Sequence, residues 1–371
     1  MPKIVIERAH PHVDENLKRI LRENTPEGSI RIRYEREPSF RGGCQVEGTD
    51  LELAYAKDVD AEKLIGICVR ATKACYINQD KAEMGYLSSL RIDKSYRNTF
   101  ALIKFYRYLK TVHQASSCKW DIMMITAGNH QAEQLFLSRR AGLPGAYSLG
   151  RFFTFSLGLK QAKNKVHSDP SIRTLREDEL DKWFDFLNRV GPRQRELFPE
   201  YQKSHLNTEN GLLKGIKPEN IYVAIENDRI IGTVSVWDQN PFKQYYIDGY
   251  SSGIGLFRGV YNAYARLTGR PILPGVGQPL KSVFLSTICV EEDREDVFEK
   301  LLKRARSDLA SENRFHSLMT GFHERDPLVS VVKKLPHVRY ESEAWLVSWE
   351  DVESLTRHLS QSKIYLELGA L

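Results

Sequence analysis

The sequence lacks the features that identify several classes of protein. No apolar run approaches the roughly 18 residues that a membrane-spanning helix needs, so we expect no membrane contact. The opening MPKIVIERAHPHVDENLKRIL lacks the basic start, apolar core and cleavage site of a secretory signal. HExxH and Walker loops are also absent, which removes the usual motifs of zinc proteases and P-loop enzymes.

Cysteine is scarce, and its spacing argues against disulfides and metal. The five cysteines are odd in number and form no CxxC pair, which favours a reducing compartment. His10 and His12 have no partner at metal-ligand spacing, so we expect no metal site. We therefore expect a cytoplasmic protein with five buried thiols: Cys44, Cys68, Cys75, Cys118 and Cys289.

Charge of one sign is not concentrated anywhere that would indicate nucleic-acid binding. The net charge of +6 arises from 54 basic residues interleaved with 48 acidic ones. This diffuse excess mildly favours anionic ligands. Because no basic stripe, zinc module or aromatic-interleaved RNA signature accompanies it, we expect no nucleic-acid partner.

The chain length and an internal repeat predict two domains. A chain of 371 residues is too long for one ordinary core. A polar linker, LGLKQAKNKVHSDPSIR, follows the strand-like RFFTFSL near residue 160. Beyond it, SIRTLREDELDKWFDFLNRV restates the strand and amphipathic helix that open the chain. We therefore predict domains over residues 1–160 and 171–371.

Each half continues with antiparallel strands and then a helix. The first offers LELAYAKDVDAEKLIGICVRATKACYI and AEMGYLSSLRI, and the second offers the hairpin NIYVAIENDRIIGTVSVWD and later SVFLSTICV. Gly232 in the second hairpin matches Gly66 in the first. The predicted fold class is α+β, with two tandem domains that each contain a mixed, mostly antiparallel sheet flanked by helices.

The stretch LSSLRIDKSYRNTFALIKFYRYL, residues 87–109, reads as a strand, a basic turn and a helix. The helix begins near Arg97, Asn98 and Thr99, where unpaired amides and the positive end of the helix dipole form an anion site. Every turn between a strand and a helix has such an end, so this feature alone does not establish phosphate binding.

The order of these elements resembles the GNAT superfamily of acetyl-CoA-dependent N-acetyltransferases, in tandem over nearly the whole chain. In that family a central strand, here YLSSLRI, splays from its neighbour and pairs with the pantetheine arm. The next turn, usually R/Q-x-x-G-x-G/A, takes the pyrophosphate, and a later Asn, matched by Asn129, contacts the cofactor. The resemblance implies acetyl-CoA as co-substrate and a cofactor site at Leu90, Arg91, Ile92, Arg97, Asn98, Thr99, Phe100, Ala101, Asn129 and Phe136.

Two departures from the family pattern bear on activity. Phe100 and Leu102 occupy the positions expected to be small, which narrows the phosphate cradle but leaves its backbone amides. Phe136 matches the usual Tyr acid and cannot donate a proton, although a thiolate leaves tolerably without one. A main-chain amide near Leu90 would be the oxyanion donor. The nearest carboxylate for a base is Glu83, for which an ordinary surface role is the alternative.

The second half resembles a copy that has lost its cofactor site. Its corresponding turn, EEDREDVFEKLLKRA, gathers acids that stabilise the helix start but repel a pyrophosphate. Residues 239–281 form a long insertion rich in aromatic residues and glycine. This insertion either covers the first domain's cleft or carries a helix whose Tyr and Phe residues pack into a core.

Two functions remain open from the sequence. One is an N-acyltransferase that moves acetyl from acetyl-CoA to a primary amine, a small molecule or a peptide, with its site in the N-terminal domain. The other is a catalytically inactive tandem GNAT-fold protein that binds a ligand or partner. The sequence does not indicate the oligomeric state.

Overall fold

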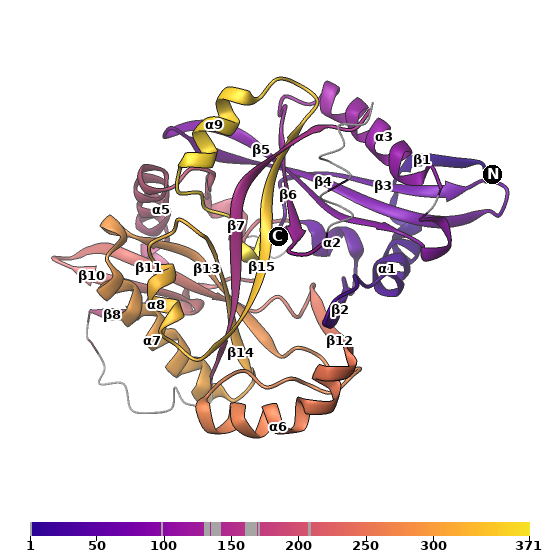
Figure 1. Ribbon diagram of the computed structural model, residues 1–371. Helices are drawn as coiled ribbons and strands as arrows, with labels where there is room; N and C mark the ends of the chain where they lie inside the picture. The colour runs from indigo at the N-terminus through magenta and orange to yellow at the C-terminus, as the bar shows by residue number, and fades with distance from the viewer. Residues whose placement is uncertain are drawn as a thin grey trace.

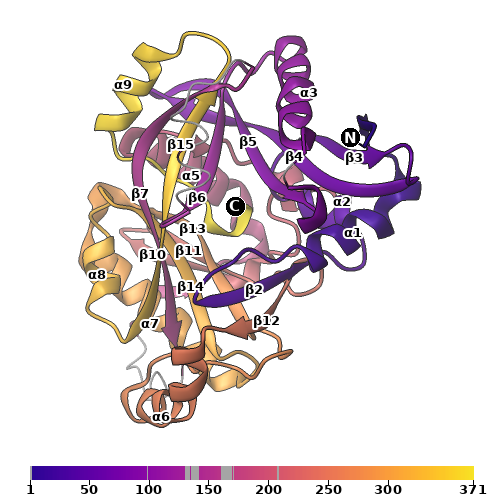
Figure 2. The same ribbon diagram turned by 45° about the vertical axis from the view of Figure 1, so that its right-hand side comes forward.

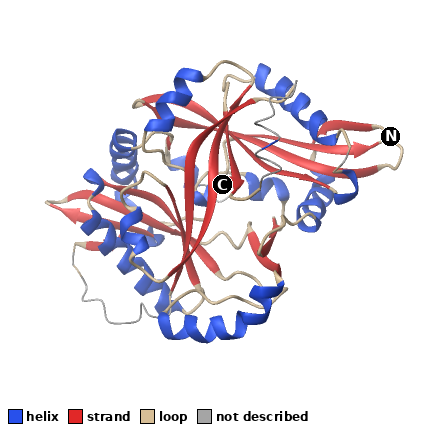
Figure 3. Cartoon of the chain, in the orientation of Figure 1, coloured by secondary structure: helices blue, strands red, loops and turns tan. Residues whose placement is uncertain are grey.

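The structure is a computed structural model that describes residues 2–97, 99–129, 134, 142–159, 169, 171–206 and 209–371. It contains a large mixed sheet with helices packed around it, as Figure 3 shows. The predicted α+β class is confirmed, and no helix in the described ranges is long and apolar enough to cross a membrane.

The first half alternates strands and helices as its hydrophobic pattern indicates. The strand from 63 to 77 reads KLIGICVRATKACYI, whose β-branched residues suit a pleated surface. The elements are β1 (Ile4–Arg8), α1 (Asp14–Glu23), β2 (Ile30–Glu35), α2 (Phe40–Cys44), β3 (Asp50–Asp58), β4 (Lys63–Ile77), β5 (Asp80–Ile92), α3 (Ala101–Ala115), β6 (Asp121–Thr126) and β7 (Gly145–Gly158).

The second half repeats this order and adds a long insertion. A strand and an amphipathic helix again come first, as expected from the sequence repeat. The elements are β8 (Ile172–Thr174), α5 (Leu180–Gln194), β9 (Phe198–Pro199), β10 (Ile221–Glu226), β11 (Arg229–Trp237), β12 (Gln244–Tyr250), α6 (Ser252–Thr268), β13 (Ser282–Val290), α7 (Glu295–Glu312), β14 (Ser317–His323), α8 (Val329–Lys333), β15 (His337–Ser348) and α9 (Glu353–Gln361).

One continuous sheet joins the two halves. Its order is β1-β3-β4-β5-β6-β15-β7-β14-β13-β11-β10-β8, and β9 pairs with β4. The long strands β7 and β15 run from one half into the other (Figure 1). Strand β15, from the C-terminal part of the chain, lies between β6 and β7 and pairs with both. Strand β7 of the first half pairs with β14 of the second, and β15 of the second half pairs with β6 and β7 of the first. The predicted domain boundary between residues 160 and 171 therefore stays a prediction.

Helices α3 and α7 occupy corresponding places after β5 and β13. The buried side of α3 includes Phe105, Tyr106 and Leu109, as its spacing predicts. Helix α7 likewise buries Phe298 and Leu301. All five cysteines are buried, which confirms the expectation of buried thiols.

The insertion between β11 and β13 contacts the first half. Strand β12 pairs antiparallel with β2, with Tyr245 opposite Tyr34. Figure 2 shows this two-stranded ribbon below α1 and α2. This pairing brings the insertion against the first half, and its expected role as a cover over the cleft stays a prediction. The alternative, a helix that packs its aromatic side chains into a core, is wrong for α6, because Phe257 and Tyr264 are exposed.

Candidate active site

Strands β5 and β6 diverge along their length. They pair in parallel only where Gly85, Tyr86 and Leu87 face residues 121–123. Strand β5 continues to Ile92 and β6 continues to Thr126, but no pairing between them is found in these stretches. The second part of β5 therefore presents backbone groups that its neighbour does not use.

A buried ion pair lies where β5 and β6 are still paired, at the start of the splay. Arg70 Nε lies 2.6 Å from Asp121 Oδ1, and both side chains are buried. Arg70 also donates to the Cys118 carbonyl over 2.9 Å. The residue opposite is Gly85, where a Cβ would lie 1.7 Å from Asp121 Oδ1. Glycine is therefore required at the point where β5 and β6 meet.

A bulge interrupts β5 at the start of the splay. The register with β4 shifts between Ile67 and Val69, so that Ser89 and Leu90 together lie opposite one residue of β4 and β5 carries one additional residue. Ser89 has φ of 53°, in the left-handed region. A bulge leaves its additional residue unpaired and bends the strand. Within the described ranges, no side chain accepts a hydrogen bond from the Ser89 or Leu90 amide.

The second half repeats this bulge but fills it. Between β11 and β13 the register shifts in the same way, and Thr287 has φ of 47°. Here the Thr287 amide donates to Glu367 Oε2 over 2.8 Å, and the Ile288 amide donates to the Tyr365 hydroxyl over 3.2 Å. The C-terminal segment thus supplies side-chain acceptors to these two amides, whereas the corresponding amides of Ser89 and Leu90 have no side-chain acceptor in the described ranges.

The turn after β5 leads into the N-terminus of α3. Arg97 is exposed, and the Ala101 amide donates to Thr99 Oγ1 over 3.3 Å. Phe100 is 54% exposed, so its side chain lies largely in solvent. Leu102, the other bulky residue, lies in the first turn of α3 and packs against the core beneath the helix. Leu102 is therefore turned away from the solvent-facing start of the helix, and Phe100 is not buried there. The first amides of a helix have no intrahelical partner, and Thr99 takes that of Ala101.

The nearby carboxylate in this turn is neutralised. Asp93 accepts from Lys63 Nζ over 2.8 Å and from the Ser95 hydroxyl over 2.8 Å. Although burial pushes its pKa upward, these hydrogen bonds lower the pKa of Asp93 to about 2. Arg97 therefore adds a cation beside a turn whose acid is already paired.

The corresponding acids of the second half are part of its packing. Asp293 lies 2.7 Å from Arg195 Nη2 and 2.6 Å from Lys363 Nζ. Arg195 is buried and also contacts Asp326, with Nε 2.7 Å from Oδ2. The acidic turn of the second half is thus fixed by its own cations.

A buried polar cluster lies on the other face of β5, away from α3. Glu47 is fully buried and accepts a hydrogen bond from Ser88 Oγ, beside the bulge. Arg36 Nη2 lies 3.4 Å from Glu47 Oε1. Lys243 and Lys73 are buried in the same region, where the charge of Glu47 opposes the lowering of their pKa by burial.

Burial changes the proton affinity of these lysines. Burial and the nearby Arg36 guanidinium lower the pKa of Lys243 to about 7. Burial also lowers the pKa of Lys73. Lys243 Nζ donates to the Gly369 carbonyl over 3.1 Å. The cluster therefore holds a carboxylate beside an amine that can change charge near neutral pH.

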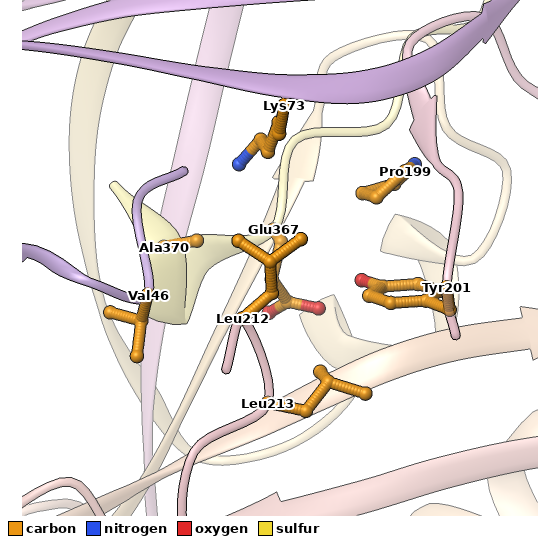
Figure 4. Close-up of a pocket in the computed structure, with 8 residues that line it drawn as sticks. All are labelled: Val46, Lys73, Pro199, Tyr201, Leu212, Leu213, Glu367 and Ala370. Carbon is orange, nitrogen blue, oxygen red and sulfur yellow. The ribbon is translucent and has the colours of Figure 1, made fainter. Parts of the chain in front are cut away.

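A small cavity borders this cluster between the two halves. Its volume of about 10 Å³ has room for roughly one water molecule. Figure 4 shows the amine of Lys73 and the carboxylate of Glu367 at this cavity. The lining residues are Val46, Lys73, Pro199, Tyr201, Leu212, Leu213, Glu367 and Ala370.

The structure brings most of the expected cofactor residues to one end of the splay. Leu90, Arg91 and Ile92 form the diverging part of β5, and Arg97, Thr99, Phe100 and Ala101 form the turn and helix start. Asn129 follows the end of β6, and its amide donates to the Thr126 carbonyl over 3.1 Å. Because β5 and β6 are parallel, their ends meet at the same edge. Asn98 and Phe136 lie outside the described residues.

Glu83, the expected base, lies elsewhere on β5. It is exposed and accepts a hydrogen bond from Ser117 Oγ. Glu83 precedes Leu90 by seven residues, which corresponds to about 23 Å along a strand. Its role as base stays a prediction that this placement does not favour.

Sequence reasoning missed Glu47, Lys73 and Lys243. A signal was present for the two lysines. Lys73 interrupts the apolar strand LIGICVRATKACYI, and Lys243 interrupts the aromatic run PFKQYYI. Charged residues in such runs are rarely fully buried without a specific role. Glu47 gave no signal, because it lies in a polar connection between α2 and β3.

No protein-family model matches the chain, and no curated protein matches it. Solved structures do. A fungal GCN5-related glucosamine N-acetyltransferase region, within a multi-domain β-N-acetylglucosaminidase, has a TM-score of 0.60 at 9% identity, over 93% of this chain and 38% of that one. N-myristoyltransferase from Saccharomyces cerevisiae, with bound myristoyl-CoA, has a TM-score of 0.60 at 12% identity, over 92% of this chain and 82% of that one.

A GCN5-related N-acetyltransferase from Anabaena variabilis is also similar, with a TM-score of 0.52 at 8% identity, over 94% of this chain and 73% of that one. Identities this low bear on the fold alone. The fold expected from the resemblance is confirmed: the chain has the fold of the GNAT N-acyltransferases over most of its length.

Proposed function

We propose that this protein is an N-acyltransferase that moves an acetyl group from acetyl-CoA to a primary amine, with its site in the N-terminal half. The observation that carries the proposal is the splay of β5 from β6 beyond Leu87, where a bulge places the Ser89 and Leu90 amides without a side-chain acceptor in the described ranges. The equivalent amides of the second half are occupied by Glu367 and Tyr365, so we assign the second half a structural role.

The residues of the splay fit an acyl-CoA. Leu90, Arg91 and Ile92 have backbone groups that β6 does not use and that can pair with an extended amide-containing arm, and the Leu90 carbonyl also accepts from Arg91 Nη1 over 3.0 Å. The first amides of α3, with Arg97 beside them, suit a pyrophosphate. Phe100 lies mostly in solvent and so leaves the helix start open. Bound there, acetyl-CoA supplies an activated acetyl group.

The chain provides two groups for the transfer. The open amide at Leu90 would stabilise the negative charge that develops on the acetyl carbonyl oxygen. Glu47, in contact with Ser88 next to the bulge, would take the proton of the attacking amine. We prefer Glu47 to Glu83, because Glu47 touches the splayed part of β5. The acceptor amine, on a small molecule or a peptide, would approach from the buried polar cluster.

A thermal-shift titration with acetyl-CoA and with coenzyme A tests the proposal. At a hundredfold excess over Kd, binding adds about 2.7 kcal/mol of stability. Unfolding entropy of about 2.1 cal/mol/K per residue over 371 residues converts this to a rise of about 3.5 °C. Arg97→Glu should abolish the rise, and Glu292→Ala, in the second half's turn, should leave it unchanged. No rise at millimolar cofactor would contradict the proposal.

The inactive binding protein is the second candidate, and one observation favours it. The cavity at the polar cluster holds about one water, which is too small for an acceptor without movement. A thiol-release assay with a panel of amines separates the two functions. The five native cysteines are buried, so they should add little background to thiol detection. Cofactor binding without thiol release from any amine would support the binding protein.

A further inference from the structure

Helix α6 turns its apolar side chains toward solvent. At 3.6 residues per turn, the five positions concerned fall within about 100° of the helix circumference. These exposed side chains are Leu256, Phe257, Val260, Tyr264 and Leu267, each between 50% and 80% exposed.

The inner face of α6 is held by polar contacts. Asn262 Nδ2 donates to the Leu273 carbonyl over 2.9 Å, and the Leu273 amide donates to Asn262 Oδ1 over 2.8 Å. The Tyr261 hydroxyl donates to the Pro271 carbonyl over 3.1 Å. A surface helix of a water-exposed protein normally has the opposite arrangement, with the apolar stripe inside. The outward stripe therefore indicates a partner that is apolar.

The helix is accessible in the fold. In both Figure 1 and Figure 2, α6 lies along the lower margin of the molecule. Val276 is exposed as well, in the adjoining loop that Asn262 holds through Leu273. The apolar surface thus extends beyond the helix itself.

After Asp248, the segment that carries α6 has charge of one sign. Residues 249–290 contain no Asp or Glu, whereas the whole chain has 48. The same stretch contains Arg258, Arg266, Arg270 and Lys281, of which Arg266 and Lys281 are exposed. An apolar stripe with basic residues near it complements a surface that is both apolar and anionic.

The size of the stripe argues against a stable dimer. A helix of 17 residues is about 25 Å long and about 10 Å wide, so its face covers about 250 Å². A stable interface buries about 800 Å² on each partner. Binding to a membrane does not require so large a buried area, since short interfacial helices bind through one apolar face and nearby cations.

We propose that α6 binds the headgroup region of an anionic lipid membrane, with Leu256, Val260 and Leu267 inserted among the lipids. The proposal departs from the expectation of no membrane contact. That expectation was based on the absence of long apolar runs. Such runs indicate helices that span a bilayer, and they do not detect helices that lie in its surface. The proposal does not depend on acyl transfer.

Vesicle sedimentation tests the proposal. Wild-type protein should bind phosphatidylcholine vesicles that contain phosphatidylserine about tenfold more strongly than vesicles of phosphatidylcholine alone, and added salt should reduce this preference. Val260→Glu should weaken binding about tenfold. Ser311→Glu, which adds the same charge to an exposed position of α7, should have no effect. Equal binding to both vesicles, or equal binding by Val260→Glu and wild type, would overturn the proposal.

A second measurement does not depend on a disruptive substitution. Because the five native cysteines are buried, Val260→Cys can be labelled selectively with a dye whose emission reports polarity. The emission should shift to shorter wavelength with anionic vesicles, whereas a dye at Ser311→Cys should show no shift. Absence of the shift at 260 would overturn the proposal. So would a concentration-dependent dimer that Val260→Glu abolishes and that binds no vesicles.

Discussion

Lys243 should make the stability of the protein depend on pH, and Lys243→Met should remove that dependence. Lys243 directly precedes β12 in the sequence, and its side chain is buried. Its Nζ donates to the backbone oxygens of Gly369 and Leu371 over 3.1 Å and 3.3 Å. Burial, with Arg36 nearby, lowers its pKa from 10.5 to about 7. Methionine has a similar length and no titratable group.

The size of the effect follows from proton linkage. Between pH 7 and 10.5 the unfolded chain binds a proton at Lys243 that the folded protein lacks. Stability therefore rises with pH through this window, by at most about 1.4 kcal/mol per pH unit. The stabilisation is complete above the unfolded pKa and is lost as the pH falls to the folded pKa. From pH 7 to about pH 8.5 the rise attributable to Lys243 is about 1.6 kcal/mol.

Urea unfolding at these two pH values measures the difference. Subtracting the Lys243→Met data from the wild-type data isolates the contribution of Lys243, because Lys73 and the other titrating groups are common to both proteins. Lys281→Met, at an exposed position of the same insertion, is the matched control and should retain the wild-type pH dependence. The same pH dependence in Lys243→Met and wild type would refute the assignment of a buried, neutral amine.

Three further predictions concern the splay and the second half. Glu47→Gln should lower the rate of acetyl transfer by about 10² to 10⁴ in a thiol-release assay, with the acetyl-CoA thermal shift retained, because the amide cannot take a proton. Gly85→Ala should destabilise the protein by about 3 kcal/mol in urea unfolding, because its Cβ would lie 1.7 Å from Asp121 Oδ1. Arg195→Met should cost about 3 to 5 kcal/mol by the same measurement, because it leaves Asp326 buried without its cation.

Matched variants control these measurements. Glu83→Gln should leave the transfer rate unchanged, and a loss equal to that of Glu47→Gln would return the base to Glu83. Gly259→Ala, on a helix with no atom near the new methyl group, should be neutral or slightly stabilising. Arg189→Met removes an exposed ion pair to Glu291 and should cost at most about 1 kcal/mol. An Arg195→Met variant as stable as this control would contradict the structural role of the buried pair.

The sequence by itself predicted the elements whose evidence is local. Helix α3 could be predicted from apolar residues at helical spacing, and Phe105 and Leu109 are buried as expected. The hairpins and their matched glycines, Gly66 and Gly232, could also be predicted, and the register places them opposite Ile92 and Val290. These features depend on contacts between residues near each other in the chain, which leave a periodic pattern in the sequence.

The site itself was only partly predictable. The splayed strand and the turn at Arg97 could be located because they follow one another in the sequence. The cluster of Glu47, Ser88 and Lys243 could not, because it joins three segments that no spacing rule connects. Glu83 was chosen for its nearness along the strand, whereas the carboxylate that contacts Ser88, next to the bulge, is Glu47 from another segment.

Only the tertiary structure decided how the two halves are joined and in which of them side chains occupy the amides of the bulge. Strand β15 lies between β6 and β7, although its residues follow those with which they pair by 180 positions or more in the sequence. Glu367 fills the bulge at Thr287, while no side chain in the described residues does so at Ser89. A strand's hydrophobic pattern specifies which face is buried but not which strand lies beside it, and the final neighbours are set by packing across the whole chain.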